Sequence, residues 1–130
     1  MIAVDASILV TALADDGPDG DRARFRLRGE RLTAPHLIDI EVLSAWRRLR
    51  TVGALDERRA QLAIADLQDL RLDRVAHAVL LERCWELRSN ATVYDASYVA
   101  LAELVGVTLL TADAKLAAVP GLRCEVELLS

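Results

Sequence analysis

Aromatic side chains are scarce in this chain, and their scarcity limits how a core can be built. They make up 4% of the 130 residues, whereas hydrophobic residues as a whole make up 53%. Leu, Val, Ile and Ala must therefore fill the interior, as they do in buried parallel sheets covered by helices. The length suffices for one sizeable core and is too short for two ordinary domains. We expect residues 1–130 to form a single α/β domain rather than a β-sandwich.

The chain also lacks a hydrophobic run long enough to cross a bilayer. Its longest uncharged apolar stretch covers residues 104–112, whereas a membrane-spanning helix needs about 20 apolar residues. The N-terminus has no basic region followed by an apolar core of the signal-peptide type. We therefore expect a soluble, cytoplasmic protein with no membrane partner.

Cysteine and histidine are few, and none of them forms a metal-binding motif. Cys84 and Cys124 lie far apart in apolar surroundings, which favours reduced, partly buried thiols to which we assign no chemistry. His36 and His77 have no partner at ligand spacing, so we interpret both as structural.

Lysine is almost absent, because 15 of the 16 basic residues are arginine, and the net charge is −4. The negative total alone argues against a nucleic-acid partner, but the distribution of charge matters more. Arginine binds phosphates and stacks on bases. Solvated helix faces that happen to carry arginine are the alternative. The arginines cluster at residues 22–31, 47–50 and 58–59.

Segments typical of strands and helices alternate along the chain. Apolar runs predict strands at residues 2–4, 31–34, 72–75, 107–110 and 122–128. Helical spacing and end signals predict helices over residues 7–13, 21–28, 35–52, 57–70, 77–88 and 94–105, with a short helical piece from residue 115. Pro35 is expected in the first turn of its helix, Asp56 is expected to cap the helix that follows it, and Gly53 and Gly106 are expected to end helices.

This alternation predicts the architecture. Strands that alternate with helices favour parallel pairing through right-handed crossovers, with helices on both faces of the sheet. The expected fold is a three-layer α/β/α sandwich around a central, mainly parallel sheet.

Four acidic residues are expected to meet at one edge of that sheet. Asp5 and Asp113 each follow an apolar strand, Asp95 lies in the first turn of a helix, and Glu41 lies on a helix that follows a strand. Ligands bind beyond the carboxyl ends of strands in open parallel sheets. All four carboxylates can therefore reach one pocket.

Each acid also has a simpler explanation. Asp5, Asp95 and Asp113 stand near helix starts, where a capping carboxylate contributes about 1 kcal/mol, and Glu41 alone is typical of a solvated helix. Together, however, two carboxylates about 4 Å apart repel by roughly 4 kcal/mol at an effective dielectric near 20. Such a cluster needs a cation, and oxygen ligands without His or Cys select Mg²⁺, with Mn²⁺ as a substitute.

At this point a set of motifs resembles a known family. The segments IAVDAS, APHLIDIEVLSAW and TVYDASYVALAELVGVTLLTAD, followed by Lys115 and Leu116, resemble the VapC toxins of the PIN-domain ribonucleases. The motifs occur in order over essentially the whole chain. The resemblance implies a PIN-like fold and a metal-dependent endoribonuclease that cleaves RNA phosphodiesters, inhibits translation and growth, and is the toxin of a type II toxin–antitoxin pair.

The resemblance also implies site residues and partners. The catalytic quartet would be Asp5, Glu41, Asp95 and Asp113. Of these, Asp5, Asp95 and Asp113 would hold one or two Mg²⁺ ions, and Glu41 would complete the metal shell or orient the attacking water. Ser7 and Thr111 match small hydroxyl positions that flank the first and last acids. Implied partners are RNA, a VapB-type antitoxin in the active-site groove, and a second copy in a homodimer.

An acidic pocket that binds RNA needs cations around it, because the substrate is itself negatively charged. The candidate contacts for RNA, or for an acidic antitoxin tail, are Arg22, Arg24, Arg26, Arg47 and Arg48. We leave Asp39 out of the quartet, because two residues before Glu41 it points elsewhere on the helix.

Other classes of protein remain as alternatives. A receiver-like signalling domain gathers acids around Mg²⁺, but no adjacent acidic pair closes the first strand here. A haloacid-dehalogenase-type phosphatase needs a second Asp two residues after the first, where this chain has Ser7. A PIN-like RNA- or protein-binding module without catalysis is the third alternative, although no acid of the quartet is missing.

Overall fold

Five short strands form a central sheet in which every pair of neighbours is parallel. The structure is a computed structural model that describes all 130 residues. The strand order is β3-β2-β1-β4-β5. The strands are β1 (Ile2–Val4), β2 (Leu32–Pro35), β3 (Leu72–Val75), β4 (Leu109–Thr111) and β5 (Val126–Leu128).

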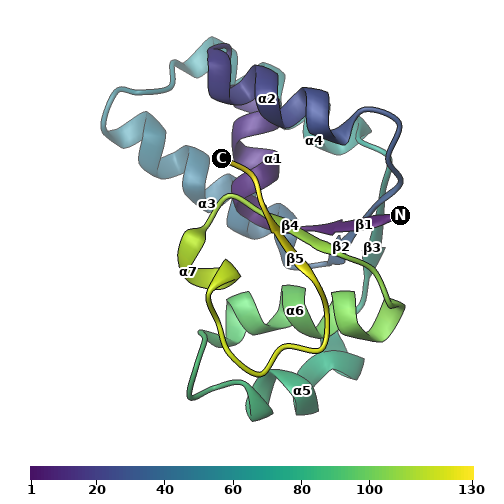
Figure 1. The fold of residues 1–130 in the computed structure, drawn as a ribbon. Coiled ribbons are helices and arrows are strands. Elements are labelled where there is room, and N and C mark those ends of the chain that lie inside the picture. Colours follow the sequence, from purple (N-terminus) through teal and green to yellow (C-terminus); the bar gives the residue numbers. More distant parts are fainter.

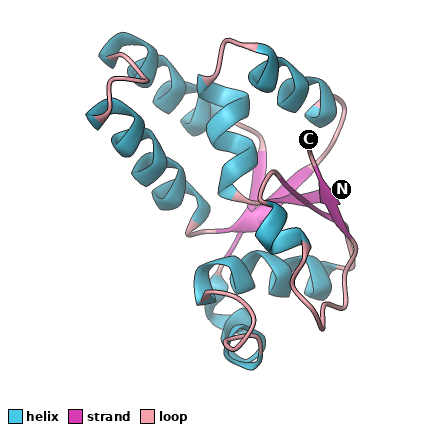
Figure 2. Ribbon diagram, turned by 60° about the vertical axis from the view of Figure 1, so that its left-hand side comes forward, coloured by secondary structure: helices cyan, strands magenta, loops and turns pink.

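Helices cover both faces of this sheet, so the predicted three-layer arrangement is confirmed (Figures 1 and 2). On one side lie α1 (Ala6–Ala14), α2 (Pro18–Leu27), α3 (Ile38–Thr51) and α4 (Glu57–Asp69). On the other side lie the 3₁₀ helix η1 (His77–Leu80), α5 (Leu81–Glu86) and α6 (Val93–Val105), and the short α7 (Ala114–Ala117) stands beside the sheet after β4. None of these helices has the length and hydrophobicity that crossing a membrane would require.

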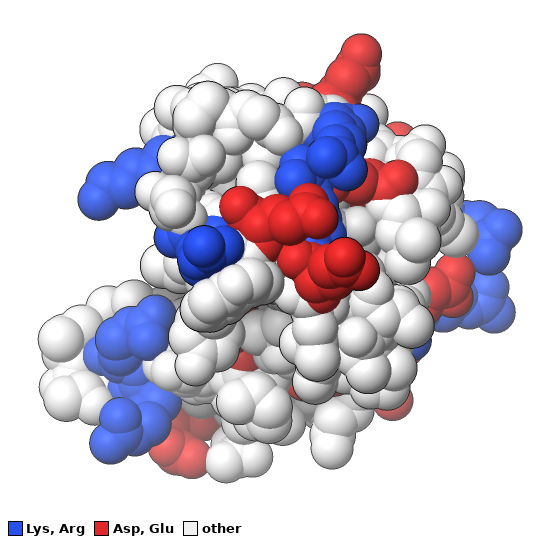
Figure 3. Space-filling view, turned by 90° about the horizontal axis from the view of Figure 1, so that it is seen from below, with Lys and Arg blue, Asp and Glu red and all other residues white.

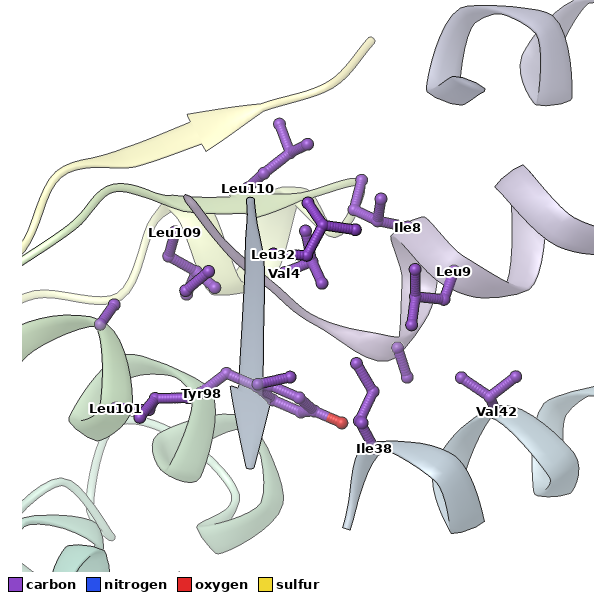
Figure 4. Close-up of a cluster of buried hydrophobic side chains, with 14 of the residues drawn as sticks. Val4, Ile8, Leu9, Leu32, Ile38, Val42, Tyr98, Leu101, Leu109 and Leu110 are labelled. Atoms are coloured by element: carbon purple, nitrogen blue, oxygen red, sulfur yellow. The ribbon is translucent and has the colours of Figure 1, made fainter. Parts of the chain in front are cut away.

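The core lies on both sides of β1 and is aliphatic, as the composition predicted. All three residues of β1 are buried, and so are seven consecutive residues of α6, Ala96 to Ala102. A helix that is buried nearly all round must be hydrophobic on most of its faces. Figure 4 shows Val4 and Leu110 of the sheet beside Ile8 of α1, with Tyr98 of α6 directing its hydroxyl towards Ile38 of α3.

The register of the sheet brings the ends of β1 and β4 together. Ala3 pairs with Leu109, and Val4 pairs with Leu110. The amide of Asp5 then donates to the carbonyl of Leu110 at 3.3 Å. Two segments more than a hundred residues apart in the sequence therefore leave the sheet side by side at its carboxyl edge.

Pro35 was assigned wrongly to a helix. It is the last residue of β2, where it pairs with Val75, and the amide of His36 donates to the Val75 carbonyl at 2.9 Å. The helix begins only at Ile38. The fixed φ of proline suits an extended segment as well as a first helical turn, so the residue itself does not distinguish the two.

The second helix was also placed wrongly at its start, because the segment rich in Asp and Gly was read as a loop. It begins at Pro18, a favoured first helical residue. Gly20 lies inside this helix, where its backbone passes close to residue 15. A side chain does not fit at this position, because a Cβ there would stand 1.8 Å from the Asp15 carbonyl oxygen. The glycine thus permits a close approach rather than marking a turn.

Three further boundaries differ from the prediction. The segment expected as one helix over residues 77–88 is divided into η1 and α5, which ends at Glu86. The fourth strand begins two residues later than expected, and the last strand covers only Val126–Leu128.

Candidate active site

The four acidic residues expected to meet do line one cavity at the carboxyl edge of the sheet. The cavity has a volume of about 410 Å³. Its polar lining consists of Asp5, Ser7, Thr11, Glu41, Arg48, Asp95, Tyr98 and Asp113. The acids come from the ends of β1 and β4 and from two helices that lie on opposite sides of the sheet, α3 and α6.

Asp5 is the most firmly held of the four. It is 5% exposed, and each of its carboxylate oxygens accepts a hydroxyl hydrogen bond of 2.5 Å, Oδ1 from Ser7 and Oδ2 from Thr111. The Ser7 hydroxyl also accepts from the amide of Ala112, and Thr111 Oγ1 accepts from the amide of Asp113, both at 3.0 Å. The two hydroxyls therefore fix the Asp5 carboxylate and tie the end of β1 to the segment that carries Asp113.

Glu41 is held in place through the packing of α3. Five residues further on, the indole of Trp46 is 2% exposed and donates from Nε1 to the carbonyl of Val10 at 3.2 Å, which fixes α3 against α1. The Oε1 atom of Glu41 is buried and has no hydrogen-bond partner. Buried carboxylate oxygens without a donor are uncommon in proteins, so this atom lacks a partner that the functional state would be expected to supply.

Asp95 and Asp113 differ in how they use their carboxylates. The start of α6 is capped by Thr92, whose hydroxyl accepts from the amide of Asp95 at 3.1 Å. Asp113, by contrast, caps α7 by accepting from the amide of Lys115 at 2.9 Å through Oδ1. Asp5 precedes α1 but makes no side-chain cap bond. Helix capping therefore explains Asp113 in part and does not explain Asp5 or Asp95.

The negative charges of the cluster oppose one another. Burial raises the pKa of Asp5, Glu41 and Asp95. Neighbouring carboxylates add to this effect: the charge of Asp95 raises the pKa values of Asp5 and Glu41, and the charge of Asp113 raises the pKa of Asp95. The cavity is thus an environment that a cation would stabilise.

The donor set suits a hard divalent cation, although the side chains do not already form a closed metal cage. No three His, Cys, Asp or Glu side chains are arranged to hold one ion. Mg²⁺ usually keeps several waters and takes only one or two protein carboxylates, so it does not need such a cage. The carboxylate and hydroxyl oxygens of the lining and the mutual repulsion of the acids both fit such an ion.

The candidate arginines are placed very differently from one another. Arg22 pairs with Asp19 at 3.0 Å, Arg24 with Asp21 at 2.7 Å, and Arg26 with Glu127 at 2.6 Å. Arg47 is exposed and unpaired, and only Arg48 lines the acidic cavity. Figure 3 shows basic side chains in several separate groups around a central acidic group, without a continuous basic belt on that face.

Two further residues near the four acids, Asp39 and Tyr98, have different environments. Asp39, left out of the quartet, makes a double ion pair with Arg74 at 2.7 and 2.9 Å, which accounts for its charge. Tyr98 also lines the cavity and is 1% exposed, and it was not among the residues predicted from the sequence. Its spacing from Asp95, three residues on one helix, was the available signal, because such residues share a helix face.

Comparison with known proteins agrees with this geometry. The profile of the PIN domain family matches residues 2–122. Ribonuclease VapC1 of Mycobacterium tuberculosis is 44% identical over 126 residues, which are 96% of this chain and 95% of the relative. Ribonuclease VapC9 of the same species is 43% identical over 129 residues, covering 97% and 96% of the two chains. The chain therefore belongs to the PIN-domain family, among its VapC-type ribonucleases.

Solved structures share the fold at lower sequence identity. The VapBC2 structure from Rickettsia felis, bound to a DNA fragment from its promoter, aligns with a TM-score of 0.70 and 17% identity over 100% of both chains. The sarcin-ricin loop cleaving toxin VapC20 of Mycobacterium tuberculosis aligns with a TM-score of 0.65 and 19% identity, covering 91% of this chain and 94% of that one. These likenesses show the common fold.

Proposed function

We propose that this protein is a metal-dependent endoribonuclease and the toxin of a VapBC-type pair, which cleaves RNA in the cytoplasm and thereby inhibits translation and growth. The observation that carries the proposal is the meeting of Asp5, Glu41, Asp95 and Asp113 in one cavity of a chain that belongs to the VapC-type ribonucleases. The names of its relatives support RNA as the substrate.

Asp5, Asp95 and Asp113 are the residues that would hold Mg²⁺, or Mn²⁺ in its place. A divalent cation bound there supplies Lewis acidity, which lowers the pKa of a water and offsets charge on the scissile phosphate. Ser7 and Thr111 keep the Asp5 carboxylate in one orientation through their hydrogen bonds. Their contribution is to hold one ligand rigid, which is what hydrogen-bonding neighbours of metal ligands generally do.

Glu41 and Arg48 face the cavity from α3. The carboxylate of Glu41, which lines the cavity, can accept a hydrogen bond from the attacking water or complete the metal shell. Arg48 is the one basic residue in the lining, and it can contact a phosphate beside the cleaved bond. Arg47 adds positive charge on the exposed side of α3. The remaining candidate arginines already form ion pairs, which must break before they can contact RNA or an antitoxin; these are Arg22, Arg24 and Arg26.

An antitoxin of the VapB type is the proposed protein partner, and the shape of the surface supports a groove for it. Val10 and Thr11 line both the acidic cavity and a neighbouring hollow of about 550 Å³ between α1, α3 and α4. That hollow also contains three acids, Asp15, Asp16 and Asp56, and one base, Arg59, which pairs with Asp16 at 2.9 Å. An acidic, partly apolar groove repels RNA and suits a peptide with basic and apolar side chains.

A homodimer is the proposed assembly. Val79 of η1, together with Leu81 and Trp85 of α5, is more than half exposed. Large apolar side chains that gather on one surface commonly mark a protein interface. Light scattering of the purified chain measures its mass and tests the proposal, and a monomer at micromolar concentration contradicts it.

Cleavage of RNA by the purified chain, with and without a divalent cation, tests the proposed activity. We expect cleavage with Mg²⁺ or Mn²⁺, none in excess chelator, and none for Asp95→Asn. The matched control is Asp69→Asn, because Asp69 is exposed on α4 and makes no ion pair; it should cleave as the unmodified chain does. The 5′ ends of new RNA fragments in cells that express each variant show whether the cuts are discrete.

The alternatives predict other results. A binding module without catalysis would retain RNA in a filter assay and cleave none with either cation. A receiver-like domain would become labelled by acetyl phosphate, whereas a ribonuclease would not. Cleavage that survives Asp95→Asn would show that the acidic cavity is not the active site.

A further inference from the structure

Two buried polar atoms near the acidic cavity have no hydrogen-bond partner, and they lie close to each other. They are the hydroxyl oxygen of Tyr98 and Oε1 of Glu41, and no other buried side-chain nitrogen or oxygen in the chain lacks a partner. Both residues line the same cavity, and burial, together with the charge of Glu41, raises the pKa of the Tyr98 phenol. One is a donor and the other an acceptor, so each can satisfy the other.

The surroundings of Tyr98 leave its hydroxyl few other choices. The side chain is 1% exposed, and its ring lies in the core between α6 and the sheet (Figure 4). The hydroxyl points across the sheet towards α3, the helix that carries Glu41. A buried hydroxyl without an acceptor is unfavourable, and the Glu41 carboxylate in the same cavity lining is the acceptor that also lacks a partner.

We propose that Tyr98 is a positioning residue for Glu41: its phenol donates a hydrogen bond to Oε1 and thereby leaves Oε2 as the oxygen that faces the cavity. This inference rests on the proposed ribonuclease function and deepens it. In this arrangement Oε1 fixes the orientation of the Glu41 carboxylate, and Oε2 contacts the water or the metal ion. A single defined carboxylate geometry is required whether Glu41 orients the water or completes the metal shell.

The core location of Tyr98 supports this role rather than a direct one. Its ring is fixed among aliphatic side chains, so the hydroxyl is held rigidly without a loop to move it. A rigid donor behind a catalytic carboxylate reduces the number of conformations that the carboxylate can adopt before reaction. Hydrogen-bonding groups that support metal ligands typically change activity or metal affinity by roughly 10- to 100-fold when they are removed.

The hydrogen bond is tested directly by NMR, without reference to cleavage. The chain contains two tyrosines, so ring labelling of tyrosine gives one signal from buried Tyr98 and one from Tyr94, which is 63% exposed. We expect a Tyr98 hydroxyl proton that is protected from exchange, and we expect Glu41→Ala to abolish its signal. Persistence of the same signal in Glu41→Ala would overturn the proposal.

Kinetics test the consequence for the reaction. We expect Tyr98→Phe to lower kcat roughly 10- to 100-fold with an unchanged KM, and to bind Mn²⁺ with an unchanged stoichiometry. Tyr98→Phe combined with Glu41→Gln should be no slower than Glu41→Gln alone, because one residue acts through the other. Tyr94→Phe is the matched control and should retain full activity.

Independent effects of Tyr98 and Glu41, in which the two losses multiply, would refute the positioning role, and so would full activity of Tyr98→Phe. Absence of cleavage by the unmodified chain would instead refute the proposed function, and the NMR measurement would still decide whether the hydrogen bond exists. The two failures are therefore distinguishable.

Discussion

Asp95→Asn is expected to stabilise the protein in the absence of divalent cations while abolishing activity. The Asp95 carboxylate is half-buried, and burial together with the charge of Asp113 raises its pKa. An acid whose pKa is raised on folding is harder to ionise in the folded state than in the unfolded one. It therefore reduces stability progressively as the pH rises through its unfolded value of 3.8 towards its folded value.

The magnitude follows from the charge that is removed. Two partly solvated carboxylates that lie several ångströms apart at an effective dielectric near 20 repel by roughly 2 kcal/mol. Solvent screening of the exposed half of Asp95 reduces this to about 1 kcal/mol. Thr92 still caps the helix in the variant, because its hydroxyl accepts from the backbone amide of residue 95. A gain of about 1 kcal/mol raises the melting temperature of a domain of this size by roughly 3 to 5 °C.

Thermal unfolding at pH 7.5 measures this gain, once in excess EDTA and once with Mn²⁺. We expect Asp95→Asn to melt higher than the unmodified chain in EDTA, and Mn²⁺ to stabilise the unmodified chain more than the variant. Asp69→Asn is the control for loss of an acid outside the cavity. A variant that melts lower than the unmodified chain in EDTA would refute the view that the acids repel one another.

Three further perturbations test separate parts of the structure. Thr111→Val removes one of the two hydroxyl donors to the buried carboxylate of Asp5. We expect urea denaturation to show that the free energy of unfolding falls by about 2 kcal/mol. An unchanged denaturation midpoint would contradict the role of these hydroxyls in holding Asp5. Burial would raise the pKa of Glu103, but the ion pair with Arg83 lowers it overall. The ion pair therefore contributes to stability above pH 4.5, and this contribution is lost as the pH falls through the lower folded pKa. Acid unfolding of Glu103→Gln should lack this loss of stability, and an acid-unfolding curve identical to that of the unmodified chain would contradict the prediction. Arg48→Ala should raise KM for RNA and reduce the slope of log binding constant against log salt concentration by about one unit. Arg22→Ala is the control and should change neither quantity. Equal effects of the two substitutions would contradict a phosphate contact of Arg48 in the cavity.

The local sequence was sufficient to predict most elements of the fold. The buried run of β1, the Asp56 cap of α4 and the end of α6 at Gly106 were all predicted and are confirmed. Asp56 accepts from the amide of Arg59 at 2.7 Å, and Gly106 has a positive φ. These features depend on neighbours in the chain. Pro35 was misread for the opposite reason: its strand conformation is decided by pairing with Val75, which is forty residues away.

The candidate site shows the same division. The order and spacing of the acidic motifs indicated which four residues belong together, because strands that alternate with helices converge at one edge of a parallel sheet. Sequence patterns do not show side-chain environments. Only the tertiary structure shows that both oxygens of Asp5 accept hydrogen bonds from hydroxyls. It also shows that Arg24 is hydrogen-bonded to Asp21 and to two backbone carbonyls, and that Arg48 is the one arginine that lines the cavity.

The sequence by itself thus determined the family, the sheet and which four acids meet at its edge, since periodicity and motif order are properties of the chain. The tertiary structure decided which charges remain free and which polar atoms lack partners. The proposed pairing of Tyr98 with Glu41 belongs to this second group, because it would join two helices on opposite sides of the sheet. Contacts of that kind depend on how the layers pack, and no local pattern encodes them.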